Sequence, residues 1–432
     1  MLIVITLFLL SSSHSSGAEL FSVFSFKRRV LVLLSGNAAG QAITVAISPL
    51  LTRLYSPEAF GQFGIFLSIV AILSVFATLR FERGIVVAGS TREQRSLFLL
   101  VVGIAVVTGI IITMFALLIP MEWLLPDSSA HLVVLREWGW IIGLAVTFTG
   151  WEIALRHIAL KRGYFGVMAV SRVGHACVQG GGQAVMGGIG WSAGLTLGAV
   201  FSLVFRICWL ACALSKDMKA VCRRSLVDVG GAWRRNKDFP RYMVAASLCT
   251  AFISQGLMVL GGVLASAAVV GQLYLAHRML VLPMSLLTRS VTDVNFKELS
   301  ETNVSQIRCV YLSRAKRLII WGTGPFLAAF ILSPFVYPLV FGDEWQASGR
   351  FAQLLIPGLW VQFAISPFGP TFWVLKRHRL FLGLSVIRMI LLFAGMGAGF
   401  ILFGAEGIAA GFSLGVAIGY ALQHKLLLLA LR

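Results

Sequence analysis

The chain has 432 residues, of which 58% are hydrophobic and only 12% are charged. Soluble domains average about 25% charged residues, so this composition indicates a membrane protein and argues against a soluble enzyme. The net charge of +19 would suggest nucleic-acid binding in a soluble chain, but basic loops beside membrane spans account for it here. We therefore expect no nucleic acid among the partners.

The first 26 residues precede the first predicted span and contain the apolar run MLIVITLFLL. Ten apolar residues are too few to cross a bilayer, which needs about 20, and the run lacks the positively charged start of a signal peptide. Cleavage at Ser16-Gly17-Ala18 is an alternative, but the basic residues at 27–29 favour retention inside. We interpret residues 1–26 as an N-terminal extension outside the fold, with an over-extended start and a true first residue near Leu20 or Val23.

Twelve apolar segments of about 20 residues follow, separated by short loops. A helix of about 20 residues crosses the ~30 Å hydrocarbon core of a bilayer. The predicted spans are 30–52, 60–79, 97–119, 138–155, 164–188, 191–214, 242–265, 267–288, 318–341, 351–373, 380–403 and 407–424. We therefore predict an all-α polytopic membrane protein of about 12 transmembrane helices.

The basic residues are distributed unevenly between the loops. Of the 36 Lys and Arg, 29 lie in the termini and alternate loops that share one side, three lie in the opposite loops, and four lie inside spans. An excess of Lys and Arg marks cytoplasmic loops. We predict a multi-pass protein of the bacterial inner membrane with both termini in the cytoplasm.

Two short motifs recur in the two halves of the chain. FGQFGIF at 60–66 resembles VGQLYLA at 270–276, and LKRGYFGVMAVSRV at 160–173 resembles LKRHRLFLGLSVIRM at 375–389. Six spans in each half start both halves on the same side, so the repeat is parallel and its pseudo-twofold axis runs along the membrane normal. The predicted parts are a six-helix lobe at 27–215, a cytoplasmic linker loop at 216–241 and a second six-helix lobe at 242–432.

Four arginines lie inside the predicted spans, and two of them, Arg172 and Arg388, occupy near-equivalent repeat positions. An arginine at mid-span costs about 2.5–3.5 kcal/mol on insertion scales, so it is expected to face a protein interior. Deep acids are scarce, and Glu152 has Arg156 as its obvious partner. A cationic interior without matching acids favours an anionic ligand. The predicted substrate-binding residues are Arg278, Arg172, Arg388 and Arg206, with snorkelling or helix bridging as the structural alternative.

Motifs for catalysis or metal binding are not recognised in the sequence. GGGQAVMGGIG at 180–190 lacks the Lys-Ser/Thr of a phosphate-binding loop. Cys208 and Cys212 share one helix face without other soft ligands, so we predict no metal site. His175 and His277 are candidates for proton transfer, but a lone helical histidine is more often a packing residue. We predict no catalytic residue, no cofactor and no enzymatic activity.

Residues 27–87 closely resemble the opening of bacterial polysaccharide-transport flippases, the Wzx-type members of the multidrug/oligosaccharidyl-lipid/polysaccharide exporter superfamily. The block L-x-R-L-Y-S-P-E-x-F-G at 51–61 is the most specific part, and 270–301 is similar to the family's eighth span and its cytoplasmic exit. The resemblance extends over about 27–431. It implies two lobes in a V shape around a cationic cavity. The family's cavity arginines form no sequence motif, so the site residues rest on the depth of the arginines.

The resemblance also implies a function and partners. The expected activity is translocation of undecaprenyl-pyrophosphate-linked oligosaccharide from the cytoplasmic to the periplasmic leaflet, for O-antigen, capsule or exopolysaccharide synthesis. The implied partners are this lipid-linked oligosaccharide and membrane lipids, with a glycan polymerase and a chain-length regulator as further candidates. The alternatives are a drug or small-molecule antiporter of the same superfamily, a glycan polymerase or transferase, and a membrane scaffold. The largest outer loop has only about 18 residues, between Pro120 and Glu137, which argues against a polymerase or transferase.

Overall fold

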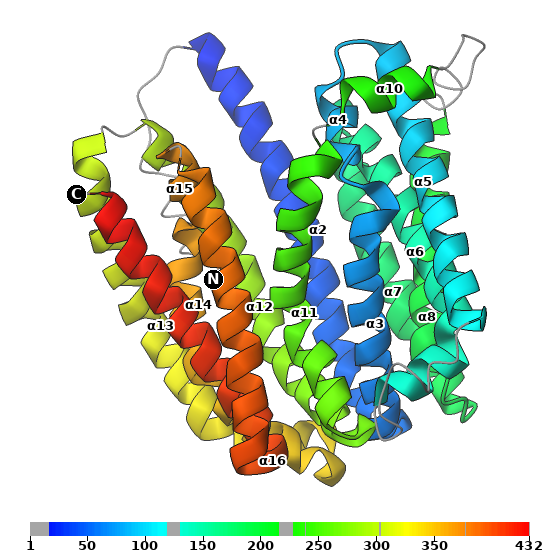
Figure 1. The fold of residues 1–432 in the computed structure, drawn as a ribbon, viewed down its shortest axis with the longest axis vertical. Helices are drawn as coiled ribbons and strands as arrows, with labels where there is room; N and C mark the ends of the chain where they lie inside the picture. Colours follow the sequence, from blue (N-terminus) through cyan, green and yellow to red (C-terminus); the bar gives the residue numbers. More distant parts are fainter. Residues whose placement is uncertain are drawn as a thin grey trace.

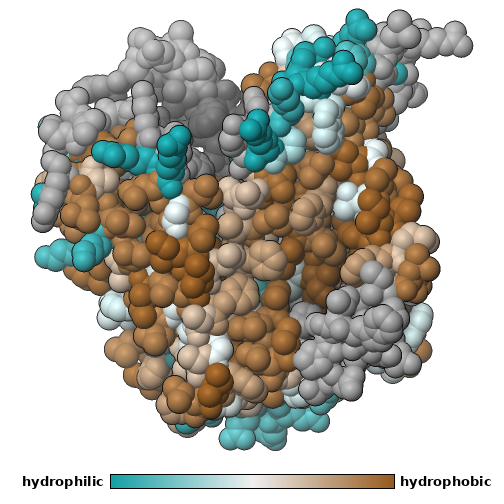
Figure 2. All heavy atoms as spheres, in the orientation of Figure 1, coloured by the Kyte–Doolittle hydropathy of each residue, from teal (hydrophilic) through white to brown (hydrophobic). Residues whose placement is uncertain are grey.

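The computed structural model describes residues 17–118, 130–215, 228–237, 239–301, 304–375 and 377–431. Every regular element in these ranges is helical, and the long helices run side by side along the molecule (Figure 1). A hydrophobic belt separates hydrophilic patches at the two ends (Figure 2). The predicted all-α polytopic membrane fold is confirmed.

Twelve helical segments in the described residues correspond to the twelve predicted spans. The first lobe contains α2 (Gly17–Leu54), α3 (Pro57–Thr78), α5 (Thr91–Leu118), α6 (Ala130–Arg162), α7 (Phe165–Gly188) and α8 (Gly194–Ala213). The second contains α11 (Val244–Leu264), α12 (Ala267–Glu301), α13 (Val304–Phe341), α14 (Gln346–Ile365) and the two halves of α16 (His378–Ala430). The shorter elements are α4 (Glu82–Val87), α10 (Val229–Arg235), a π turn (Phe239–Met243), two 3-10 turns (Asp343–Trp345 and Ser366–Phe368) and α15 (Thr371–Val374).

Nine of the described helices are long and apolar enough to cross a membrane by length and composition alone. The second half of α16, together with α2 and α7, completes the set of twelve. α7 is less apolar because it carries Arg172, His175, Gln179 and Gln183. Several helices also continue past their predicted spans, because the hydrophobic signal detects only the part of a helix that lies in lipid.

The break within α16 is at Gly404, whose φ is 60° and ψ is −138°. Glycine adopts such a left-handed backbone readily because it has no Cβ. The two halves then pack as an antiparallel pair in which a Cβ added at Gly399 or Gly407 would clash with the backbone of the other. Small residues allow this close approach of helices in lipid, and the break agrees with the predicted boundary between the last two spans.

The predicted linker contains a helix that the sequence analysis did not anticipate. Residues 216–227 and 238 lie outside the described residues, but α10 packs on α5, and its Trp233 ring lies 5.0 Å from that of Phe81. The amide of Gly231 and the guanidinium of Arg235 hold the pKa of the Asp228 carboxyl below its usual range. The lobe limits 27–215, 216–241 and 242–432 remain predictions, as does the role of residues 1–26, of which 1–16 lie outside the described part.

The two lobes meet where α3 of the first lobe packs along α12 of the second. A Cβ added at Gly61 would clash with the carbonyl oxygen of Ala267, and one added at Gly271 would clash with that of Pro57. The two contacts are equivalent in the repeat. Adding 210 to a residue number relates Gly61 to Gly271 and Pro57 to Ala267, so each contact is the counterpart of the other. The recurring motifs therefore lie at the pseudo-twofold axis, as a parallel repeat requires.

Trp345 of the second lobe closes one end of this seam. Its side chain is fully buried, its Nε1 donates to the carbonyl of Thr52 at 3.1 Å, and its ring lies 4.9 Å from that of Phe60. Gln272 supports the same turn by donating to the carbonyl of Glu344 and accepting from the amide of Ser348. We call this the Trp345 end and the opposite one the α10 end. The helices of the two lobes lie farther apart toward the α10 end (Figure 1).

Candidate functional site

Arg172 lies in α7 where this helix packs against α2. A Cβ at Gly36 would lie 2.5 Å from that of Ala169, and one at Gly40 would lie 3.3 Å from the carbonyl oxygen of Arg172, so the two backbones are close. The Arg172 side chain is half-buried and makes no ion pair with a described residue. It lies within electrostatic reach of three other arginines, one of them Arg289 on α12 of the second lobe.

Arg206 of α8 has an acidic partner, contrary to the expectation that it lacks one. Its Nη2 lies 3.0 Å from Oε1 of Glu152, and both side chains are largely buried. Glu152 also pairs with Arg156 at 3.3 Å, as the i,i+4 spacing predicts. The sequence offered only this local partner, because the α6–α8 packing that brings Arg206 to Glu152 joins separate helices.

Three arginines of the first lobe and one of the second form what we call the inter-lobe arginine cluster, whose members are Arg156, Arg172, Arg206 and Arg289. Arg172 and the three arginines that act electrostatically on it make four guanidinium groups, whereas Glu152 is the one described carboxylate that acts on Arg172. The sequence analysis missed Arg156 and Arg289 as site residues, since both fall at span ends, where topology alone explains a basic residue.

Arg278 lies on α12 along the seam between the lobes. It shares a helix face with Gly271 and Tyr274, because positions i, i+3 and i+7 lie on one side. Its Nη1 donates to the Tyr274 hydroxyl at 3.0 Å, and the Tyr274 ring packs over Gly64 of α3. Arg278 thus lies on the helix face that meets the first lobe, and its guanidinium is bonded to Tyr274 of its own helix, while its role as a substrate-binding residue stays a prediction.

Arg388 lies between the two halves of α16. Its guanidinium stacks 3.8 Å from the centroid of the Tyr420 ring and donates to Gln423 at 3.1 Å, while its stem packs on Gly419. Gln423 in turn donates to the carbonyl of Ile365. All of these contacts lie within the second lobe, so the structure does not bring Arg388 together with the inter-lobe arginine cluster through any contact it describes.

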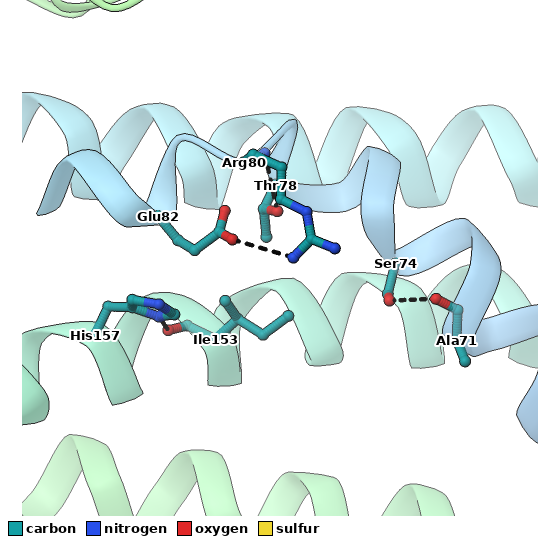
Figure 3. A network of polar contacts seen from close by, with 7 residues as sticks. All are labelled: Ala71, Ser74, Thr78, Arg80, Glu82, Ile153 and His157. Carbon is teal, nitrogen blue, oxygen red and sulfur yellow. Dashed lines mark hydrogen bonds and ion pairs between the residues drawn. The ribbon is translucent and has the colours of Figure 1, made fainter. Parts of the chain in front are cut away.

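A second group of charges lies at the α10 end of the first lobe (Figure 3). Arg80 pairs with the buried Glu82 at 3.4 Å, and Leu79 and Arg80 have φ values of 44° and 66°. Non-glycine residues with positive φ are strained, and such strain persists only where surrounding contacts hold it. His157 on the facing α6 has its Nδ1 at 2.7 Å from the Ile153 carbonyl, so Nδ1 donates this hydrogen bond.

The comparisons with known proteins agree with this architecture. A family model described as polysaccharide biosynthesis protein matches residues 50–350. No curated protein matches the chain. The lipid II flippase MurJ in an inward closed conformation is 12% identical with a TM-score of 0.69, the alignment covering 93% of this chain and 88% of that one.

Drug transporters share the same fold. An inward-facing multidrug resistance MATE family transporter of the MOP superfamily is 16% identical with a TM-score of 0.61, covering 93% of this chain and 98% of that one. A mutant form of the Vibrio cholerae MATE transporter VcmN is 14% identical with a TM-score of 0.60, covering 94% of each chain. The chain therefore belongs to the polysaccharide biosynthesis protein family, and it shares the fold of the MATE transporters and of the lipid II flippase MurJ.

Proposed function

We propose that the protein translocates undecaprenyl-pyrophosphate-linked oligosaccharide across the bacterial inner membrane, for O-antigen, capsule or exopolysaccharide synthesis. The observation that carries the proposal is the inter-lobe arginine cluster. Its four guanidinium groups exceed the neighbouring carboxylates, and Arg172 has no described acid of its own. Membership of the polysaccharide biosynthesis protein family supports a glycan-bearing substrate.

The chemistry of the substrate explains why arginines are needed. A pyrophosphate loses its hydration when it enters a membrane protein, and burial of an unpaired charge is costly. Arginine replaces that hydration with paired, charge-assisted hydrogen bonds to phosphate oxygens. Because Arg172 and Arg289 belong to different lobes, a pyrophosphate bound between them contacts both.

Alternating access then follows from the two-lobe architecture. The Trp345 end is closed by contacts between the lobes, whereas the α10 end carries the basic loops. Assigning the basic side to the cytoplasm places the cluster toward the cytoplasmic leaflet. Rocking of one lobe against the other would break the Trp345 contacts and expose the site to the periplasmic side. The polyprenyl tail stays in lipid, and a glycan polymerase and chain-length regulator act on the product.

The test is export of surface polysaccharide in cells that depend on this protein. Arg172→Ala and Arg289→Ala should each reduce export by about 10-fold or more, since a charge-assisted hydrogen bond contributes about 1.5–3 kcal/mol. The Lys variants should recover only part of it, because they lack the planar two-pronged geometry. Arg53→Ala, which changes an exposed arginine at the end of α2, is the matched control.

Export by the Arg172, Arg289 and Arg53 variants can be compared only if each variant is present in the membrane at near-normal levels. Full export by the Arg172→Ala/Arg289→Ala double variant would contradict the proposal. Loss of resistance to cationic drugs, with export unchanged, would instead favour the small-molecule antiporter, although a cluster of positive charge suits such substrates poorly.

A further inference from the structure

A hydrogen bond between uncharged side chains crosses the seam near the arginine cluster. Nε2 of Gln41 on α2 donates to Oγ of Ser285 on α12 at 3.2 Å. The two helices belong to different lobes and run in opposite directions, since α2 ends and α12 begins at the Trp345 end. This bond must break when the lobes separate there.

Two residues extend this contact toward the α10 end. Asn37 precedes Gln41 by one helical turn on α2, and Arg289 follows Ser285 by one turn on α12. One turn is about 6 Å along the axis at 1.5 Å per residue. Because the helices are antiparallel, both steps go in the same direction. Asn37 therefore lies level with Arg289 across the seam.

Arg172 lies at the same height. Its backbone carbonyl is in contact range of Gly40, which lies between Asn37 and Gln41 on α2, and its charge is within reach of Arg289. Three helices from both lobes thus contribute two guanidinium groups, two carboxamides and one hydroxyl within about one helical turn along the seam.

The two carboxamides have unmet hydrogen-bonding capacity. Oδ1 of Asn37 and Oε1 of Gln41 are buried and accept no hydrogen bond from the described residues. A buried polar atom without a partner costs about 1–3 kcal/mol. Reversing the Gln41 amide would let its oxygen accept from the Ser285 hydroxyl, but its nitrogen would then take the buried position that lacks a partner, so one polar atom stays unmet. Both side chains are therefore poised to gain a hydrogen bond when the lobes part.

The chemistry of an amide oxygen selects the part of the ligand that it contacts. It accepts hydrogen bonds, and an ionised phosphate offers no donor, so a phosphate would leave the oxygens of Asn37 and Gln41 without a partner even where their N–H groups donate to it. A sugar hydroxyl both donates and accepts, and it can also take the place of Gln41 on the Ser285 hydroxyl. The amides thus suit a hydroxyl-rich group held next to an anion that the arginines bind.

We propose that Asn37 and Gln41 bind the sugar that is attached directly to the lipid pyrophosphate, so that they help to determine which glycan the protein accepts. The proposal rests on the proposed function, since it takes the arginine cluster as the pyrophosphate site. Parting of the lobes breaks the Gln41–Ser285 bond and releases an amide and a hydroxyl to the sugar. A lipid pyrophosphate without a sugar offers no donor to the two amide oxygens, so they would stay without a partner.

The test measures binding to the purified full-length protein in lipid nanodiscs. The two probes are undecaprenyl pyrophosphate and undecaprenyl pyrophosphate bearing N-acetylglucosamine. Asn37→Leu and Gln41→Leu should each weaken binding of the sugar-bearing lipid by about 5- to 10-fold, as expected for a lost hydrogen bond, and change binding of the bare lipid by less than about twofold. Gln353→Leu, which removes an amide of α14 that bonds to the Phe330 carbonyl within the second lobe, is the control.

The outcomes separate this inference from the function on which it rests. If the wild-type protein bound neither lipid, the proposed function itself would be wrong. Suppose that Arg172→Ala weakened binding of both lipids, and that each Leu variant either weakened binding of both lipids equally or changed neither. The pyrophosphate site would then stand, and the assignment of the sugar to Asn37 and Gln41 would be wrong. Should a Leu variant not fold, Asn37→Ala and Gln41→Ala carry the same comparison, because they delete the amide without adding bulk.

Discussion

Arg172 in the first lobe and Arg388 in the second occupy near-equivalent positions of the repeat, yet their surroundings differ. Arg388 is held by Tyr420 and Gln423 within its own lobe. Arg172 makes no described ion pair and lies within electrostatic reach of three other arginines. The seam at Gly61 and Gly271 is symmetric by contrast, with reciprocal backbone contacts.

The contrast indicates where the repeat constrains the molecule. At the axis, two backbones touch, and any side chain on either glycine would separate the lobes, so both halves must keep the same residue. Away from the axis, one position can hold an arginine bonded to its own lobe in one half and an arginine without a described hydrogen-bond partner in the other. An unsatisfied group is available to a ligand, whereas a satisfied one must first give up its contacts.

Removing the buried carboxylate of Glu152 should cost the most stability. Glu152→Gln removes the carboxylate that Arg156 and Arg206 share, and leaving a buried arginine uncompensated costs about 3–5 kcal/mol. We expect a marked fall in the melting temperature in detergent. Glu152→Gln/Arg206→Gln should recover much of it, because the double variant removes both charges. A single variant as stable as the wild type would show that Arg206 reaches water or lipid headgroups instead.

A smaller loss should follow from crowding the symmetric seam. Gly61→Ala places a methyl group against the Ala267 carbonyl, and such overpacking costs about 1–3 kcal/mol or more. Gly181→Ala is the matched control, because a Cβ there meets no atom within 4 Å. The control should be neutral or slightly stabilising, since alanine favours helix. Equal stability of the two variants would place the axis elsewhere.

Arg388→Ala should reduce stability by about 1–2 kcal/mol through loss of the Tyr420 stacking and the Gln423 hydrogen bond. Export per folded molecule should change little, the opposite of the result expected for Arg172→Ala. The measurement is surface polysaccharide normalised to protein in the membrane. A loss of export at normal protein levels would restore Arg388 as a substrate-binding residue, as the sequence predicted.

Labelling of exposed single cysteines tests the orientation and should leave stability almost unchanged. In a cysteine-free background, Glu344→Cys at the Trp345 end should react with an impermeant reagent from outside. Lys237→Cys, beyond α10, should react only after permeabilisation. Ser348 would be a poor reporter, because it is buried and bonded to Gln272. The reverse labelling pattern would place the arginine cluster toward the periplasm.

Much of the architecture could be predicted from the sequence, because each signal is local. A membrane span is a run of apolar residues of fixed length, and side-of-membrane preference is read from Lys and Arg in the loops. The recurring motifs at 60–66 and 270–276 marked the parallel repeat, and the structure places them against each other at the axis. The depth of Arg278 in its span predicted only that it faces protein, and its role in binding stays a prediction.

The state of each arginine was decided only by tertiary structure. Arg206 pairs with Glu152 of another helix, and Arg388 packs between the two halves of α16. Arg172 lies within electrostatic reach of Arg289 of the opposite lobe. These pairings depend on how helices distant in the chain pack together. An arginine near the middle of a span is costly, so hydropathy indicates that it needs a protein environment, whereas packing alone determines which of its hydrogen bonds remain open to a ligand.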